Sequence, residues 1–476
     1  MTEALAFRSV AETARLIADG ALSPVALVET MLSRIAAFDG TLHAYLLVLE
    51  DRALAEARTA EREIRAGRSR GPLHGIPFAV KDTFFTAGVR TCAASRLLLD
   101  HVPDRTASAI ARLEARGAIL LGKLNTWEFG TGTGAVHHDL PFPAARNPWG
   151  DGRSTGLNTG FYTGGSSSGS GAALAAGLAS FTLGSDTGGS IRLPAAACGV
   201  MGLKPSFGLV GRSGILPNCW SLDVAGPLAR TAEDLALILD AIAGPDPGDA
   251  GSSAVPAADH GAALSRGVAG LRIGLVQDPG LPIAPAIADN MRRLADHLAT
   301  QGAEIVPFAL PRPIAAYQAA SSLINWSESY AIHERDFLDR GGLMGQALRD
   351  KMMTGFAVRA VDYLAAQRER RLLAGEMDRA MASVAALLLP CTTITAPPLD
   401  DADAVVAFTR HACVAPFNIS GHPALSLPTG FDANGLPTAA QLVGQLFAEP
   451  ALLGIAACCE TLRASCHPSL TGSIRP

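Results

Sequence analysis

Two serines in glycine-rich sequence are the residues of this chain best suited to nucleophilic chemistry. Ser166 lies in GGSSSGSG (164–171), and Ser190 lies in GSDTGGSIRLP (184–194). Glycine-rich backbone adopts conformations that other residues cannot, and it lets a substrate approach main-chain N–H groups closely. A serine hydroxyl beside such donors can attack a carbonyl group while the donors stabilise the resulting oxyanion.

A third residue suited to this chemistry is Lys81, which follows the apolar run IPFAV (76–80). The chain has 39 Lys plus Arg, yet only four of these are lysines, namely Lys81, Lys123, Lys204 and Lys351. Arginine does not release its proton near neutral pH, whereas a desolvated lysine can. Because an unperturbed lysine has a pKa of about 10.4, burial must lower the pKa of Lys81 substantially before it can serve as a base.

Regular elements are expected to hold these residues in place. The Ala/Leu run 172–179 suits a short packed helix, and residues 181–183 suit a buried strand, so both serines fall at the ends of elements. Apolar periodicity predicts helices over residues 8–68, with Ser23 as an N-cap and Pro24 at the first helical position. From residue 76, short apolar runs alternate with helical segments, which predicts a mostly parallel, buried sheet with helices on both faces.

Bulk composition narrows the class of protein. A chain of 476 residues with 48% hydrophobic and 17% charged residues favours a large buried core. The net charge of −5 indicates no nucleic-acid partner, and no apolar run is long enough to predict a membrane span. Eight scattered cysteines without a CxxC pair, and an N-terminus unlike a signal peptide, predict reduced thiols in the cytoplasm. Residues 244–266 are expected to be a surface linker.

The three segments together resemble the signature of the amidase signature family. GGSSSGS, GSDTGGSIRLP and the AVKD segment (79–82) occur in the order of that signature, and GKLN (122–125), RNPW (146–149) and GLKPSFG (202–208) also match. The resemblance covers nearly the whole chain. It implies an α/β fold, an α/β/α sandwich around a large mixed β-sheet, in one domain over residues 1–476 with N-terminal helices (1–68) packed on the core. It implies no cofactor and no metal.

The resemblance also implies catalytic roles. Ser190 would be the acylated nucleophile, Ser166 the bridging serine, usually preceded by a cis peptide bond, and Lys81 the base. The oxyanion hole would consist of the backbone N–H groups of Thr187, Gly188, Gly189 and Ser190.

Further residues are expected to support the site or to contact the substrate. By resemblance, Asp186 and Arg192 would brace the serine loop, and Ser167 would add a hydrogen bond to Lys81. Gly130 and Thr131 would face the acyl group. The segment 150–163, several residues longer than in relatives, could form a pocket wall through Phe161 and Tyr162, and a solvated surface insertion is the alternative.

Other chemistries fit the residues less well. A phosphate-binding P-loop needs a lysine where this chain has Ser170. The GTGTGA segment (130–135) matches a dinucleotide motif without the acidic residue that such a site requires. His137, His138 and Asp139 lack the spacing of a zinc site, and a loop of ordinary polar residues is expected there.

These observations predict a stand-alone hydrolase of amide bonds in small, partly apolar molecules, with aryl amides, carbamates and esters as candidate substrates. Its partner would be that small molecule, with no nucleic acid and no membrane, and a homodimer is left open. The glutaminase chains of tRNA-dependent amidotransferases carry a TENSAFG-like segment where this chain has AVHHDLPFP (135–143), which favours the stand-alone enzyme. Two alternatives stay open: the glutaminase subunit of a tRNA-dependent amidotransferase, and a catalytically silent binding or scaffold protein on the same fold.

Overall fold

A computed structural model describes residues 2–131, 139–149, 160–255 and 258–466. An eleven-stranded sheet runs through these residues in the order β1-β3-β2-β4-β6-β5-β10-β11-β9-β7-β8. The strands are β1 (Tyr45–Val48), β2 (Pro77–Lys81), β3 (Ile119–Leu124), β4 (Phe181–Asp186), β5 (Met201–Lys204), β6 (Val224–Ala229), β7 (Arg272–Leu275), β8 (Glu304–Pro307), β9 (Ala386–Pro390), β10 (Ala424–Phe431) and β11 (Pro437–Gly444).

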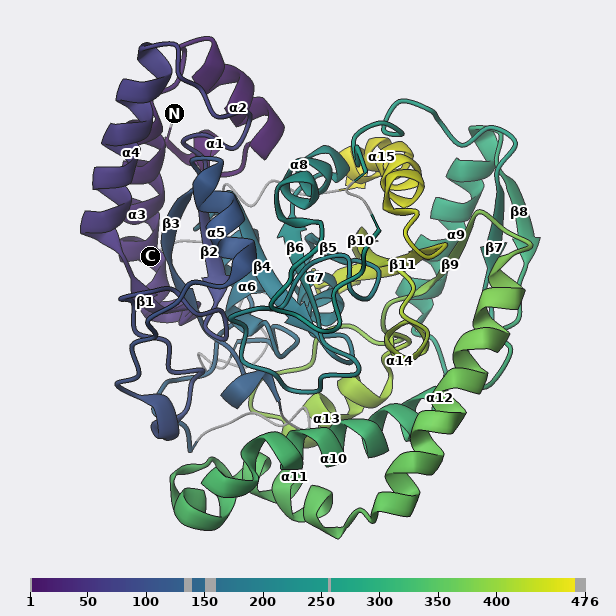
Figure 1. Ribbon diagram of the computed structural model, residues 1–476. Helices are drawn as coiled ribbons and strands as arrows, with labels where there is room; N and C mark the ends of the chain where they lie inside the picture. Colours follow the sequence, from purple (N-terminus) through teal and green to yellow (C-terminus); the bar gives the residue numbers. More distant parts are fainter. Residues whose placement is uncertain (1, 132–138, 150–159, 256–257, 467–476) are drawn as a thin grey trace.

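Helices cover this sheet. They are α1 (Thr2–Ala6), α2 (Val10–Ala18), α3 (Pro24–Leu42), α4 (Glu50–Arg65), α5 (Ser108–Ala115), α6 (Ser168–Ala175), α7 (Arg192–Cys198), α8 (Ala232–Ile242), α9 (Pro285–Thr300), α10 (Ile314–Arg340), α11 (Gln346–Ala357), α12 (Ala360–Met381), α13 (Ala402–Arg410), α14 (Ala415–Ile419) and α15 (Glu449–Cys466), with 3₁₀ turns at Arg96–Leu98, Glu128–Gly130 and Gly341–Leu343. Figure 1 shows the purple helices α3 and α4 beside β1 and β3 at one edge, and the green helices α10 to α12 along the lower side and the opposite edge.

The sheet is mixed, as the family resemblance implies, and not mostly parallel. β2 pairs in parallel with β3 and β4, and β7 pairs in parallel with β8 and β9. The other six pairings in the described residues are antiparallel. The prediction missed β6 (VAGPLA) and β11 (PTAAQLVG), whose small residues carry little strand propensity, and these strands make much of the antiparallel centre.

The N-terminal helices share their core with the sheet. Leu27 and Met31 of α3 are fully buried in the hydrophobic cluster that also contains Phe78 of β2 and Leu442 of β11. The predicted N-cap is confirmed, because the Ser23 hydroxyl accepts hydrogen bonds from the backbone N–H groups two and three residues later, at 3.1 and 3.2 Å. The three predicted helical segments are confirmed as α2, α3 and α4, and the prediction missed β1 at residues 45–48, between the second and the third.

The segment 244–266 contains no helix and no multi-residue strand in its described part, residues 244–255 and 258–266. It is nevertheless anchored, since Asp246 accepts hydrogen bonds from the hydroxyls of Ser108 (2.6 Å) and Ser213 (2.8 Å). Among the described helices, none is both long and apolar enough to cross a bilayer.

Candidate active site

Lys81 and Ser166 are brought into contact at the end of β2. Lys81 Nζ lies 2.7 Å from Ser166 Oγ and 3.0 Å from Ser185 Oγ, and the lysine is fully buried. The peptide bond between Gly165 and Ser166 is cis. Burial lowers the pKa of Lys81 to about 7, although the carboxylates of Asp223 and Asp186 favour its charged form. The side chain can therefore lose its proton near neutral pH.

Ser185 is a site residue that the sequence prediction missed. It makes the contact with Lys81 that was expected of Ser167, whose hydroxyl instead donates to the carbonyl oxygen of Ser185 at 3.3 Å. β4 pairs in parallel with β2, with Leu183 opposite Val80, so residue 185 arrives next to residue 81. The sequence would have predicted this contact if the apolar runs 76–80 and 181–183 had been paired as parallel strands, because parallel neighbours end at the same edge of the sheet.

Ser190 lies on the turn between β4 and α7 and is partly exposed. Its hydroxyl makes no hydrogen bond with any residue that the structure describes, and neither do the backbone N–H groups of Thr187, Gly188 and Ser190. The N–H of Gly189 differs, because it donates to Asp186 Oδ1 at 2.8 Å. Gly189 is therefore not available as an oxyanion donor, which corrects the expectation for that residue.

A buried ion pair holds this turn. Arg192 donates to both carboxylate oxygens of Asp186, at 2.9 and 3.0 Å, and to Gln441 Oε1 and Asn418 Oδ1 at 2.6 Å each. Burial alone would raise the pKa of Asp186, but the charge and hydrogen bonds of Arg192 hold it well below its usual range. The ionised Asp186 can then fix the backbone of the turn.

A cavity of about 400 Å³ opens at Ser190 and is lined by Gly130, Thr131, Lys351 and polar side chains of α10. Gly130 adopts a φ of +69°, and a Cβ built there would lie 3.0 Å from Lys81 Nζ. The glycine thus allows close backbone approach to the Lys81–Ser166 pair. Both residues expected to face the acyl group do lie at this cavity.

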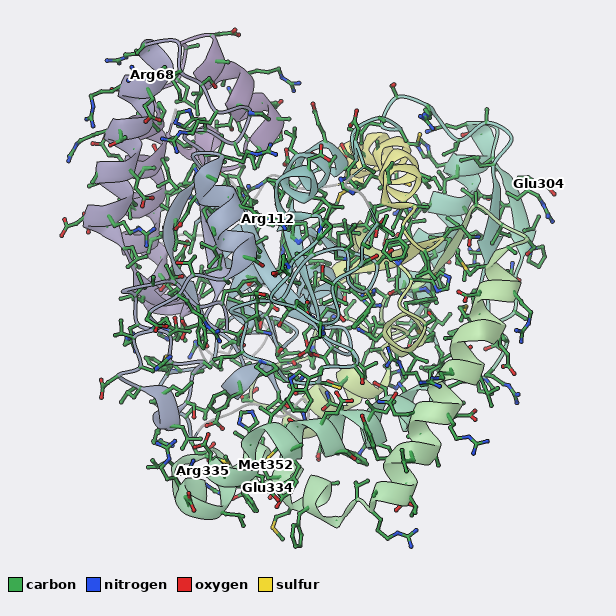
Figure 2. The ribbon with its side chains drawn as sticks, in the orientation of Figure 1. Arg68, Arg112, Glu304, Glu334, Arg335 and Met352 are labelled. Atoms are coloured by element: carbon green, nitrogen blue, oxygen red, sulfur yellow. The ribbon has the colours of Figure 1, made fainter. Side chains whose placement is uncertain are left out.

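Lys351 is the second residue that the motifs do not reveal. It is buried, and its Nζ donates to Thr131 Oγ1 and, at 3.0 Å, to Asn218 Oδ1. Burial lowers its pKa to about 7. Its helix, α11, is anchored where the N–H of Gly345 donates to Glu128 Oε2 at 2.9 Å. Figure 2 labels the next residue, Met352, in the lower helical part of the molecule.

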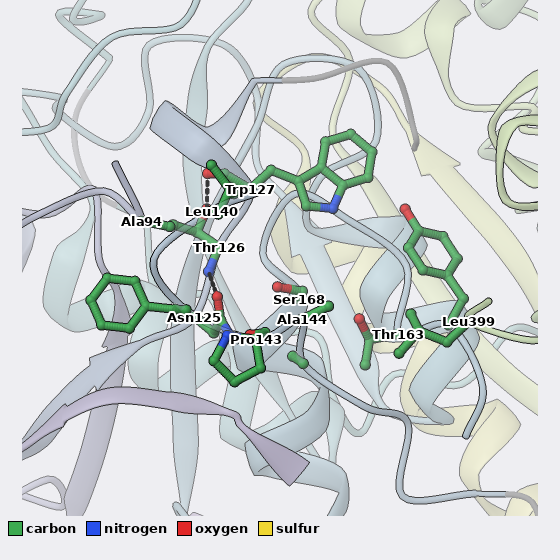
Figure 3. A pocket seen from close by; sticks show the side chains of 13 residues that line it. Ala94, Asn125, Thr126, Trp127, Leu140, Pro143, Ala144, Thr163, Ser168 and Leu399 are labelled. Atoms are coloured by element: carbon green, nitrogen blue, oxygen red, sulfur yellow. Dashed lines mark hydrogen bonds between the residues drawn. The ribbon is translucent and has the colours of Figure 1, made fainter. Parts of the chain in front are cut away.

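Phe161 and Tyr162 do not line the Ser190 cavity, which corrects the predicted pocket wall. Tyr162 is 3% exposed, and its ring lies 6.5 Å from that of Trp127 and 5.6 Å from that of Phe408. It borders a separate pocket of about 30 Å³, too small for a substrate, which Figure 3 shows around Trp127 and Leu399. Trp127 lines both spaces and lies between this aromatic cluster and the Ser190 cavity.

Several expectations fall partly outside the described residues. These include His137, His138 and most of the segment 150–163. Asp139 is described, and its carboxylate accepts a hydrogen bond from the N–H of Gln346 at 2.7 Å. In the part of the chain that the structure describes, no group of metal-ligating side chains comes together.

The comparisons with known proteins agree on the family. The family model described as Amidase matches residues 26–453. The chain belongs to the amidase signature family. It is therefore an enzyme that acts on carbon–nitrogen bonds other than peptide bonds.

Individual relatives show which members of the family this chain resembles. The chain is 37% identical, over 91% of its length and 93% of the relative, to the glutamyl-tRNA(Gln) amidotransferase A subunit of Thermosynechococcus vestitus. The solved structure of the same amidotransferase chain from Thermotoga maritima is 28% identical with a TM-score of 0.78, covering 95% of this chain and 94% of that one. The native peptide amidase of Stenotrophomonas maltophilia is 33% identical with a TM-score of 0.83, covering 97% of both chains.

These relatives overturn two predictions, that the chain works alone on small, partly apolar amides and that no nucleic acid is involved. The prediction relied on two short segments, 135–143 and 150–163, whereas the likeness to the amidotransferase chain spans nine-tenths of the sequence. The negative net charge argues only against a broad nucleic-acid footprint on this chain. It does not argue against work within an assembly that handles tRNA.

Proposed function

We propose that this chain is the amide-hydrolysing subunit of a glutamyl-tRNA(Gln) amidotransferase, where it releases ammonia from the side-chain carboxamide of glutamine. The observation that carries this proposal is the 37% identity over nine-tenths of the chain to such a subunit. The contact between Lys81 and Ser166, together with a partly exposed Ser190 that lines a cavity, supports an acyl-enzyme mechanism.

In the proposed attack step, Ser166 bridges Lys81 and Ser190, the role that the family resemblance implies for it. Neutral Lys81 accepts the proton of Ser166 Oγ across 2.7 Å, while Ser166 accepts the proton of Ser190. Ser190 Oγ then bonds to the carboxamide carbon, whose oxygen becomes an oxyanion. The N–H groups of Thr187, Gly188 and Ser190 stabilise this charge, and one such donor contributes about 3–4 kcal/mol in enzymes where it has been removed.

Release of ammonia reverses the proton relay. The proton on Lys81 returns through Ser166 to the amide nitrogen, the carbon–nitrogen bond breaks, and ammonia leaves the acyl ester on Ser190. Water then attacks the ester carbon, giving up its proton to the same relay, and glutamate departs as Ser190 regains its hydrogen. The remaining chains of the amidotransferase would consume the ammonia at glutamyl-tRNA(Gln).

We assign Lys351 to binding of the carboxylate group of glutamine. Glutamine carries a carboxylate at the end opposite its carboxamide, and a buried ammonium beside Thr131 complements that charge. An anion next to Lys351 would stabilise the protonated form of the lysine, whose pKa burial lowers to about 7. Binding of the carboxylate would thus charge the side chain that holds it.

This role also suggests a compartment. Aminoacyl-tRNA is a cytoplasmic substrate, and six buried cysteines, Cys92, Cys198, Cys219, Cys391, Cys413 and Cys459, carry free thiols. Free, mostly buried thiols fit a reducing environment. We therefore place the reaction in the cytoplasm.

The test is reconstitution with the other amidotransferase chains of the same source. The assembly should form glutaminyl-tRNA from glutamyl-tRNA and should take the new amide nitrogen from ¹⁵N-amide glutamine. Lys351→Met should raise the KM for glutamine about 10- to 100-fold, since a hydrogen bond to a charged group is lost, and Lys351→Arg serves as the charge-retaining control. An assembly that forms no glutaminyl-tRNA from glutamine would contradict the proposal.

A further inference from the structure

A second cavity, of about 700 Å³, is larger than the Ser190 cavity. Ser185, whose hydroxyl contacts Lys81, lines this cavity, and Asn218 lines both it and the Ser190 cavity. None of the roles proposed above uses this space. Its volume falls within the range of about 300–1,000 Å³ typical of small-molecule sites.

The walls of the second cavity are largely apolar and aromatic. Phe129, Ile215, Leu216 and Val224 contribute apolar surface, and Trp220 borders the cavity with 51% of its surface exposed. A half-exposed tryptophan beside a preformed cavity offers a flat, apolar contact to a ligand ring. The shape and lining favour a planar, mainly apolar molecule.

The charged side chains that line the cavity are held by ion pairs or hydrogen bonds, with one exception. Asp249 is bound by Arg212 at 2.8 Å through both oxygens. Asp223 accepts from the Thr187 hydroxyl at 2.6 Å and from backbone N–H groups. Arg105 has no hydrogen-bond or ion-pair partner among the residues that the structure describes, and its guanidinium lies over a phenylalanine ring, 5.6 Å from the centroid.

An unpaired, exposed guanidinium at a cavity without a free carboxylate among its described lining residues complements an anion. We propose that the second cavity is a binding site for a planar, largely apolar molecule that carries one anionic group, with its rings against Trp220 and its anion at Arg105. This ligand differs in chemistry from glutamine, which is zwitterionic and has no ring. The site therefore stands independently of the function proposed for the Ser190 cavity.

The probe is naphthalene-2-sulfonate, with the uncharged analogue 2-naphthol as its matched control, titrated into the full-length chain by calorimetry at pH 7. One sulfonate should bind per chain, at least about tenfold more tightly than 2-naphthol, because a charged hydrogen bond adds to the ring contact. Arg105→Gln should remove the preference for the sulfonate. Trp220→Ala should weaken both probes by about tenfold or more.

Two further variants test whether the sulfonate binds at a place other than the second cavity. Trp326→Ala alters the Ser190 cavity, and Phe356→Ser alters the exposed apolar face of α11. Both should bind the sulfonate like the unmodified chain. The proposal is overturned if no saturable binding occurs, if Arg105→Gln and Trp220→Ala bind normally, or if binding is lost in Trp326→Ala or Phe356→Ser. Thermal melting of each variant checks that it remains folded.

Discussion

Lys81 and Lys123 lie on neighbouring parallel strands, β2 and β3, and both are fully buried. Their surroundings differ in one respect. Lys123 Nζ lies 3.2 Å from Asp82 Oδ1 and also donates to the hydroxyl of Thr91 and to the carbonyl oxygen of Phe84. Among the described residues, Lys81 Nζ hydrogen-bonds only to two hydroxyl groups, one just before α6 and one in β4.

This difference separates a structural lysine from a candidate base. Burial lowers the pKa of both side chains, but the adjacent carboxylate of Asp82 opposes that shift at Lys123. Lys81 has no carboxylate in contact within the described part of the chain, so burial dominates and the neutral amine becomes accessible near pH 7. In the proposed mechanism, the base is a buried lysine without an ion-pair partner in contact among the described residues, one strand away from a lysine that has one.

The largest loss of activity is expected from a substitution of Ser190, the last residue of the proposed proton relay that begins at Lys81. Ser190→Ala should reduce amide hydrolysis by about 10⁶-fold, the size of loss seen when a serine hydrolase loses its nucleophile. The fold should persist, because the partly exposed hydroxyl has no hydrogen-bond partner among the described residues. Turnover and thermal melting of the same preparation measure both quantities, and an acyl adduct that still forms on the variant would contradict the role of Ser190.

The next effect tests Lys81 itself. Lys81→Arg keeps a positive charge but cannot accept a proton, so kcat should fall by about 10²- to 10⁴-fold, the usual contribution of a general base. Lys81→Ala should be at least as damaging. If the arginine variant keeps most of its activity, Lys81 is a structural cation and the contrast with Lys123 disappears.

A substitution of Lys123 should change the stability of the protein more than its kcat. Lys123→Met leaves Asp82 as an uncompensated buried charge and should lower the free energy of unfolding by about 3–5 kcal/mol. The loss in kcat of the folded protein should be smaller than that of Lys81→Arg. Denaturant titration measures the first quantity.

The double variant Asp82→Asn/Lys123→Met supplies the control for this effect. It removes both charges, so it should regain part of the stability lost in the single variant. If Lys123→Met is as stable as the unmodified chain, Asp82 and Lys123 do not form the ion pair that distinguishes the two lysines.

The sequence motifs predict the local setting of each candidate catalytic residue, whereas the grouping of these residues into one site came from the family resemblance. Ser166 and Ser190 stand at the ends of short apolar elements, and Lys81 ends a buried run, so their surroundings can be inferred within a few residues of each. Ser185 required the parallel register of β2 and β4. That register depends on which strands pair across the sheet, which neither run specifies alone.

The other errors of the sequence prediction also arise because tertiary packing, and not the local sequence, decides which residues meet. Lys351 lies on α11, far along the chain from the serine motifs, and only tertiary packing brings it to Thr131. Tyr162 precedes the first serine cluster closely enough to suggest a pocket wall, yet its ring packs against Trp127 and Phe408. The sequence did not predict strands β6 and β11 because their small residues have low strand propensity. These strands are stable because each pairs with a neighbour on both sides.

The protonation state of Lys81 tests the central claim most directly. The chain has only four lysines, so a protein labelled with ¹³Cε-lysine gives few signals, and each can be assigned by its absence from a Lys→Arg variant. The signal of Lys81 should titrate near pH 7, and that of Lys123 should titrate at a higher pH. A Lys81 that keeps its proton to pH 9 or above would contradict its role as a neutral base.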